Sequence, residues 1–235
     1  MNFDTKYLIR WGIPGWVFII FVGGVFICLR YSHLKDITIN ISGIFGLLVS
    51  LGFFGVTLGY LMHQIYFSIN WNSKKKNEHR IIDEAVGLVD KKEKIKNYNN
   101  HIWGNDYHSD YYLFEFLWHN ELLKLKEEKR NYIVERYRHI LSTTHGLGAL
   151  RISLIGALVM NIPMYILGFF NSEKTFLVFL PVLIILVNYY LVVVTKKGFF
   201  YYSSNLNHFQ GYFMNEFMNN EYDNSEANYR EEDSI

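Results

Sequence analysis

The sequence contains little cysteine and little proline, and long parts of it carry no charge. Its single cysteine, Cys28, has no partner in the chain, so no intrachain disulfide can form. The three prolines, Pro14, Pro163 and Pro181, all lie in apolar stretches, where a proline can kink a helix. We find no phosphate-binding glycine loop, no serine nucleophile motif and no zinc motif. These absences exclude the common signatures of nucleotide-binding enzymes, serine hydrolases and zinc enzymes, and we expect no cofactor.

Four stretches lack Asp, Glu, Lys and Arg, although 19% of the whole chain is charged and its net charge is +1. A helix needs about 20 mostly apolar residues to cross a bilayer, and each stretch is long enough. The first is too long for a signal peptide and no small-residue cleavage site follows it, so we expect it to be retained. The stretches are residues 11–29, 37–73 (with its membrane part at 41–67), 152–172 and 175–195.

Lysine and arginine collect between residues 71 and 151 and after residue 195, whereas residues 30–40 and 171–174 carry few of them. The positive-inside rule therefore predicts that both termini and the middle segment lie in the cytosol. The sequence predicts an all-α polytopic membrane protein with four transmembrane helices and a helical cytosolic insert. Its parts are a first helix pair at 1–70, the insert at 71–148, a second helix pair at 149–197, and a cytosolic aromatic-rich segment with an acidic tail at 198–235.

Hydrophobic periodicity predicts two helical regions in the insert, separated by a polar and aromatic loop at 97–108. The first is an amphipathic helix over residues 78–97, with Ile81, Ile82, Ala85, Val86 and Val89 on one stripe. The second begins at an N-cap, Ser109 or Asp110, and is free to continue into the third span. We expect residues 221–235 to be disordered because they are acidic and polar. The expected apolar faces of the second region hold Leu113, Phe116, Leu117, Leu123, Ile133, Tyr137, Ile140 and Leu141.

Small residues recur at helical spacing in the second and third spans. Such stripes let helix backbones approach closely in lipid. They have two interpretations: packing within one four-helix bundle, or an interface or pore wall in a homo-oligomer. The stripes are Ser42, Gly46 and Ser50, then Gly55 and Gly59, and finally Ala149, Ser153 and Ala157.

Two groups of polar residues are candidates for a functional site. His63 lies within the second span, where an ionisable residue suggests a proton or ion role, although it also lies near the cytosolic end and could reach the interface. A second group could hold a metal ion, but no metal motif supports this, and we interpret these residues as solvated polar faces without a metal. The second group is His101, Asp106, His108, Asp110, Glu115 and His119.

Arg138, His139 and His145 lie in the sequence "RYRHILSTTH". The pattern of Arg, His, five further residues and His resembles the Arg-x4-6-His motif of the HEPN family of helical RNases. That resemblance implies a dimer that joins two motifs, with arginine binding phosphate and histidine supporting proton transfer. The seven-residue interval places both side chains on one helical face. We favour a second interpretation, in which these side chains face lipid headgroups at the mouth of the third span, where RNA would have poor access.

Four spans, a short charged helical insert, a composition rich in lysine, asparagine and isoleucine, and the sequence "RHILSTTH" resemble the membrane-spanning accessory proteins encoded beside the RNA-guided RNase of type VI-B CRISPR loci. The resemblance implies a non-enzymatic protein of the bacterial inner membrane that modulates antiphage defence. It would act as an oligomeric assembly or channel with a cytosolic partner, such as the RNA-guided nuclease or another defence protein.

Two alternatives stay open, namely a membrane-tethered HEPN-like RNase and a small channel or transporter unrelated to defence. We do not expect direct nucleic-acid binding, because anionic lipid is the simpler partner for the basic sequence "KKKNEHR" beside the second span.

Overall fold

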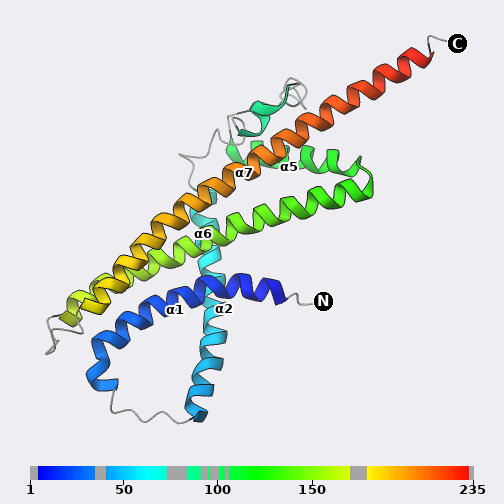
Figure 1. Cartoon of the computed structure of the whole chain (residues 1–235). Coiled ribbons are helices and arrows are strands. Elements are labelled where there is room, and N and C mark those ends of the chain that lie inside the picture. Colours follow the sequence, from blue (N-terminus) through cyan, green and yellow to red (C-terminus); the bar gives the residue numbers. More distant parts are fainter. Residues whose placement is uncertain are drawn as a thin grey trace. The chain divides into compact units, whose positions relative to one another are not determined.

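A computed structural model describes residues 5–34, 41–72, 84–90, 95, 101–103, 106–169 and 179–232. Every regular element in these ranges is a helix, which confirms the predicted all-α class. The elements, shown in Figure 1, are α1 (Thr5–Leu34), α2 (Ile41–Asn72), the short 3-10 helix η1 (Val86–Leu88), α5 (Tyr107–Leu123), α6 (Glu127–Phe169) and α7 (Phe179–Glu232).

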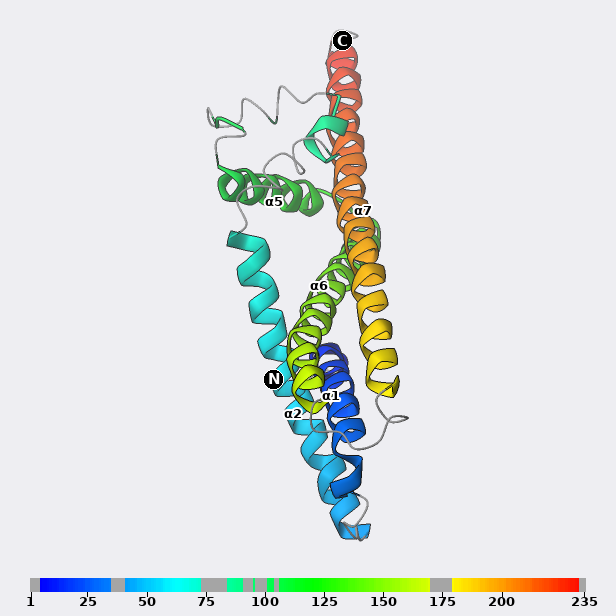
Figure 2. The ribbon, with the colours of Figure 1, turned by 90° about the vertical axis from the view of Figure 1, so that its left-hand side faces the viewer.

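The chain divides into two compact units. One, here called the apolar unit, comprises Met1–Asn70 and Thr143–Phe200; the other, here called the core unit, comprises Trp71–Ser142 and Tyr201–Ile235. Helices α6 and α7 contribute residues to both units and run as long uninterrupted ribbons in Figures 1 and 2. Four helices, α1, α2, α6 and α7, are long and apolar enough to cross a membrane, as the uncharged stretches predicted.

Within the apolar unit, α1 and α2 approach each other at glycines. A Cβ atom added at Gly15 would overlap the backbone of α2 at Gly55, and one added at Gly59 would overlap the carbonyl oxygen of Trp11. A Cβ atom at Gly55 would overlap the ring of Trp16. These contacts lie at one crossing of the two helices, between residues 11–16 of α1 and residues 55–60 in the middle of α2 (Figure 1). Only glycine leaves room for backbones this close.

Helix α6 lies parallel to α1. The contacts between them advance together along both helices, and two are hydrogen bonds from α6 side chains to backbone carbonyls of α1. In chain order, Pro14, Phe18, Phe21 and Leu29 of α1 contact Ser153, Gly156, Asn161 and Gly168 of α6. A chain that crosses a membrane four times in alternating directions has its first and third spans parallel, as these two helices are.

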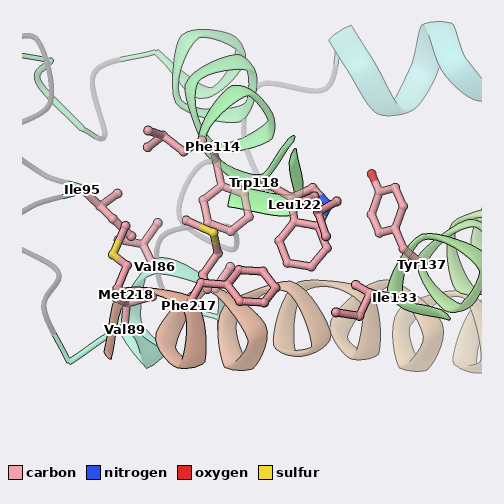
Figure 3. Close-up of a cluster of buried hydrophobic side chains, with 13 residues drawn as sticks. Val86, Val89, Ile95, Phe114, Trp118, Leu122, Ile133, Tyr137, Phe217 and Met218 are labelled. Atoms are coloured by element: carbon pink, nitrogen blue, oxygen red, sulfur yellow. The ribbon is translucent and has the colours of Figure 1, made fainter. Parts of the chain in front are cut away.

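The core unit has a hydrophobic core of its own, shown in Figure 3. Its centre is Trp118 of α5, which is fully buried and whose ring contacts Tyr137 of α6 and Phe217 of α7. Burial of such large apolar rings is a major stabilising contribution in a hydrophobic core. The remaining buried members are Ala85, Val86, Val89, Ile95, Phe114, Leu117, Leu122, Ile133, Met214 and Met218.

Several predictions for the insert were wrong. The N-cap of α5 is Asp106, whose side chain accepts hydrogen bonds from the backbone N–H groups of His108 and Ser109, and not Ser109 or Asp110. In the predicted helix 78–97, residues 84–90 form a turn and a 3-10 helix, while Ile81 and Ile82 lie outside the described residues. The predicted disorder of the tail at 221–235 is wrong for residues 221–232, because α7 continues as a helix to Glu232; residues 233–235 lie outside the described residues.

The second helical region is broken once and its core face is shifted. Residues 124–126 separate α5 from α6, after which α6 continues into the third apolar run without interruption. Phe116 and Leu123 were expected on the apolar face, but they are 54% and 70% exposed. Phe114 and Trp118 are buried in the core instead, and the ring of Trp118 packs against Phe217 of α7.

The glycine contact gives a first prediction. Substituting Gly59 with alanine should lower the thermal unfolding midpoint in detergent, because the new methyl group meets the backbone of α1 and forces the helices apart, at a cost on the order of 1–3 kcal/mol. The matched control is Gly52→Ala, on the same helix, where an added Cβ meets nothing within 4 Å. This control should be neutral or slightly stabilising, because alanine favours helix by ~1 kcal/mol. Equal midpoints for the two variants would contradict the described packing.

Candidate functional site

Polar side chains are buried inside the apolar unit. His63 of α2 is 3% exposed, so it does not reach the surface of the unit, and its ring lies 6.3 Å from that of Phe67. Thr195 of α7 donates a hydrogen bond to its own helix at the carbonyl of Leu191, at 2.7 Å. The buried polar side chains of this unit are His63, Thr144, Ser153, Asn161, Asn188 and Thr195.

Two asparagines were not singled out from the sequence. Asn161 donates to the carbonyl of Phe21 at 3.3 Å, but its Oδ1 has no hydrogen-bond partner among the described residues. Asn188 is fully buried, and neither atom of its amide finds a partner within the described part of the chain. The signal in the sequence was an uncharged amide in an otherwise apolar run. Such a residue is notable because burying an amide without a hydrogen-bond partner costs several kcal/mol.

The structure separates the small-residue stripes into two kinds. Gly55 and Gly59 are buried against α1, and Ser153 and Ala157 are buried in the same unit. By contrast, Ser42, Gly46 and Ser50 belong to a stretch of α2, residues 41–50, that is exposed throughout. A Cβ added at Gly46 would meet nothing within 4 Å. The first group therefore packs within the chain, whereas the second lies on an exposed part of α2.

His145 packs against α2. Its Nδ1 lies 3.2 Å from the hydroxyl of Tyr66, and its ring centre lies 5.8 Å from that of Tyr66 and 5.0 Å from that of Phe67. At the next turn, Gly148 leaves room for the ring of Tyr66, which a Cβ there would overlap. His145 is half-buried in this aromatic environment, and one of its two ring nitrogens is engaged with a neighbouring side chain.

Arg138 and His139, the other two residues of the motif, are exposed on α6. They belong to the core unit, whereas His145 belongs to the apolar unit. Metal-free RNA cleavage needs a cationic group and a titratable group that can reach the same phosphate. Arg138 is exposed, whereas His145 is half-buried and packs against Tyr66 and Phe67.

Glu115 of α5 joins the three helices of the core unit. Its Oε1 accepts hydrogen bonds from the hydroxyl of Tyr137 on α6, at 3.0 Å, and from Nε2 of Gln210 on α7, at 3.1 Å. Its Oε2 lies 3.4 Å from Nε2 of His119, one turn along α5. Tyr111, on the preceding turn, also donates to this carboxylate. A carboxylate with this many donors is strongly held, because bonds to a charged acceptor are about twice as strong as neutral ones.

Burial, followed by the negative charge of Glu115, raises the pKa of Tyr111 above its ordinary value. The phenol therefore remains a neutral hydrogen-bond donor throughout the physiological pH range. Because the folded-state pKa is raised, the stabilisation from Tyr111 is complete below pH ~10, the ordinary pKa of tyrosine, and decreases above it.

The histidines and carboxylates around the start of α5 form pairs. Asp110 is fully buried, and its Oδ1 lies 2.7 Å from Nε2 of His101. The interpretation of Asp110 as part of a solvated face is therefore wrong. His119 instead lies beside Glu115, and Asp106 serves as the N-cap of α5. Among the residues that the structure describes, no group of three His, Cys, Asp or Glu side chains could hold a metal ion.

The fold and these sites define an all-helical protein with four helices apolar enough to cross a membrane. Comparison with protein-family models, with curated protein sequences and with solved structures finds no match to the chain.

The contacts of His145 give a second prediction. Substituting His145 with alanine should lower the thermal unfolding midpoint in detergent, because the α6–α2 contact loses a hydrogen bond and two ring contacts, together on the order of 1–3 kcal/mol. Arg138→Ala is the control, since substitutions of exposed side chains usually change stability by less than about 0.5 kcal/mol. An RNase centre would behave differently: both variants would lose cleavage of single-stranded RNA and keep the wild-type midpoint.

The cluster around Glu115 gives a third prediction. Substituting Glu115 with alanine should destabilise the core unit by on the order of 2–4 kcal/mol, because the buried donors of Tyr137 and Gln210 would lose their acceptor. Loss of helical circular dichroism on heating measures the effect. Glu135→Ala on the exposed face of α6 removes a carboxylate outside the cluster and should change the midpoint little. Similar midpoints for both variants would show that the cluster is not important for stability.

Proposed function

We propose that this protein is a non-enzymatic integral membrane protein that acts as an accessory or effector in a bacterial antiphage system of CRISPR type. In this proposal the apolar unit lies in the inner membrane as a homo-oligomeric assembly or channel, with both termini in the cytosol. The core unit lies in the cytosol and binds a partner, such as an RNA-guided nuclease or another defence protein. The antiphage context rests on the resemblance of the topology and of the sequence "RHILSTTH" to accessory proteins of type VI-B CRISPR loci.

The observation that carries the membrane part of the proposal is the chemical contrast between the two units. The described side chains of the apolar unit, at residues 11–30, 41–70, 143–168 and 179–200, include no Asp or Glu. The core unit has a compact hydrophobic core and a carboxylate that several donors hold. A unit without carboxylates suits lipid, where charge is costly, and a unit with charged hydrogen bonds around a hydrophobic core suits water.

Two helices support a coupling role. Both α6 and α7 contribute to the core unit and to the apolar unit without interruption. Glu115 bonds to one residue on each of these helices, Tyr137 and Gln210. We expect a partner that binds the core unit to act on these two helices, and through them on the apolar unit.

The homo-oligomer is supported by the surface of α2. Residues 41–50 are exposed, and their stripe of Ser42, Gly46 and Ser50 would let another helix approach closely. A Cβ atom added at Gly46 would meet nothing within 4 Å, whereas one added at Gly55 or Gly59 would overlap α1.

The fourth prediction tests this function in cells that carry an RNA-guided RNase. Wild-type protein should lower the efficiency of phage plating relative to the nuclease alone. Insertion of two glycines between Ser142 and Thr143 should abolish this effect, because it interrupts α6 between the residues of the two units and glycine disfavours helix. The matched control places the same insertion between Leu125 and Lys126, in the existing break before α6, and should keep the effect.

Orientation is checked in the same strains. In a Cys28→Ser background, a cysteine in place of exposed Asn120 should react with a membrane-impermeant maleimide only after the membrane is opened. Unchanged plating with and without the wild-type protein would overturn the antiphage proposal. Labelling of intact cells at residue 120 would overturn the orientation, and full activity of the Ser142 insertion would overturn coupling through α6.

A further inference from the structure

Arg151 of α6 is a charged residue within the apolar unit. It is half-buried, and its Nε is buried without a hydrogen-bond partner among the described residues. The described side chains of this unit contain no Asp or Glu that could pair with it. A guanidinium group cannot lose its proton in a protein, and a partly desolvated charge without a counter-ion is costly. An anion from outside the described side chains of this unit would balance the charge of Arg151.

The position of Arg151 identifies where this anion would lie. Leu147 and Gly148, one turn earlier on α6, contact Gly198 of α7 and Tyr66 of α2. Residues three and four positions apart share a helical face, so Arg151 leaves α6 on the side that meets these two helices. Arginine side chains on a helix point towards its N-terminus, which brings the guanidinium back towards the level of Gly198.

Two further cations lie at that level. Lys196 and Lys197 directly precede Gly198 on α7, and both are exposed. Arg151 is the last charged residue before the uncharged part of α6, and Lys196 is the first after the uncharged part of α7. All three therefore lie at one boundary of the apolar unit, where a bilayer would present its headgroups.

We propose that Arg151, Lys196 and Lys197 form a binding site for the phosphate of an anionic phospholipid. A phosphate accepts paired hydrogen bonds from the planar guanidinium group, and the lysines add positive charge. Basic pockets between transmembrane helices bind anionic headgroups in this way. A lipid fits better than a soluble phosphate or RNA, because the site adjoins apolar helix surface that acyl chains would cover. This inference rests on the proposed membrane location of the apolar unit.

Native mass spectrometry of the full chain in detergent, titrated with phosphatidylglycerol or phosphatidylcholine, tests the site. Wild type should bind phosphatidylglycerol more tightly than phosphatidylcholine. Arg151→Gln should weaken phosphatidylglycerol binding about fivefold, equivalent to ~1 kcal/mol for one juxtamembrane cation. Arg151→Lys should restore most of the affinity, which separates loss of charge from loss of fold. The control is Arg30→Gln, which removes an exposed arginine of α1 and should leave the affinity unchanged.

Three results would overturn the lipid site. These are equal affinity for the two lipids, equal weakening by Arg30→Gln and Arg151→Gln, and Arg151-dependent binding of inorganic phosphate or single-stranded RNA that phosphatidylglycerol does not displace. Reconstitution into phosphatidylcholine nanodiscs distinguishes failure of the lipid-site proposal from failure of the membrane proposal. A protein that enters nanodiscs without preferring phosphatidylglycerol is a membrane protein that lacks the lipid site, whereas one that stays soluble refutes the membrane location itself.

Discussion

The close approach of α1 and α2 at Gly15, Gly55 and Gly59 is the contact on which the apolar unit depends. In lipid, apolar side chains gain little by leaving the surrounding hydrocarbon, so helices associate through close packing and interhelical hydrogen bonds. Glycines permit the first of these, because they allow two backbones to touch. Once α1 is fixed on α2, the carbonyls of Pro14 and Phe21 are in position to accept hydrogen bonds from α6. The parallel contact of α1 and α6 thus adds hydrogen bonds to an arrangement that the glycines permit.

The core unit depends on different forces. Trp118 and its neighbours are buried at the contact of α5, α6 and α7, where removal of apolar surface from water stabilises the packing. A hydrophobic core alone tolerates several helix rotations, because apolar contacts have little directionality. Glu115 restricts that freedom, because its carboxylate accepts hydrogen bonds from Tyr137 and Gln210 on two different helices. The cluster therefore fixes α5 relative to the same two helices that continue into the apolar unit.

The four apolar helices could be predicted from composition alone, because an uncharged run of about 20 residues leaves few alternatives. The start of α5 could not be, since Asp106, Ser109 and Asp110 are all good capping residues and only tertiary structure buries Asp110 against His101. The spacing of Gly55 and Gly59 indicated a close helix contact, but its partner Gly15 lies on another helix and follows no repeat. Glu115 looked like a surface residue because its partner Gln210 lies 95 positions away. Features that depend on the local sequence pattern were predicted correctly. The environment of a side chain was not predicted where a contact with a residue far away in the sequence decides it.

The two units also differ in how polar side chains find partners. In the apolar unit, Ser153, Asn161 and Thr195 donate to backbone carbonyls, which have a second lone pair free after the helical bond has formed. This satisfies an uncharged group without burying a charge. In the core unit, charged side chains pair with other side chains, as Lys129 does with Glu216 at 2.6 Å. The first pattern suits hydrocarbon and the second suits water, because water lowers the cost of holding a charge. Arg151 departs from the first pattern, since a backbone carbonyl cannot neutralise a guanidinium group, and its position at the end of the uncharged run of α6 is where an external anion could.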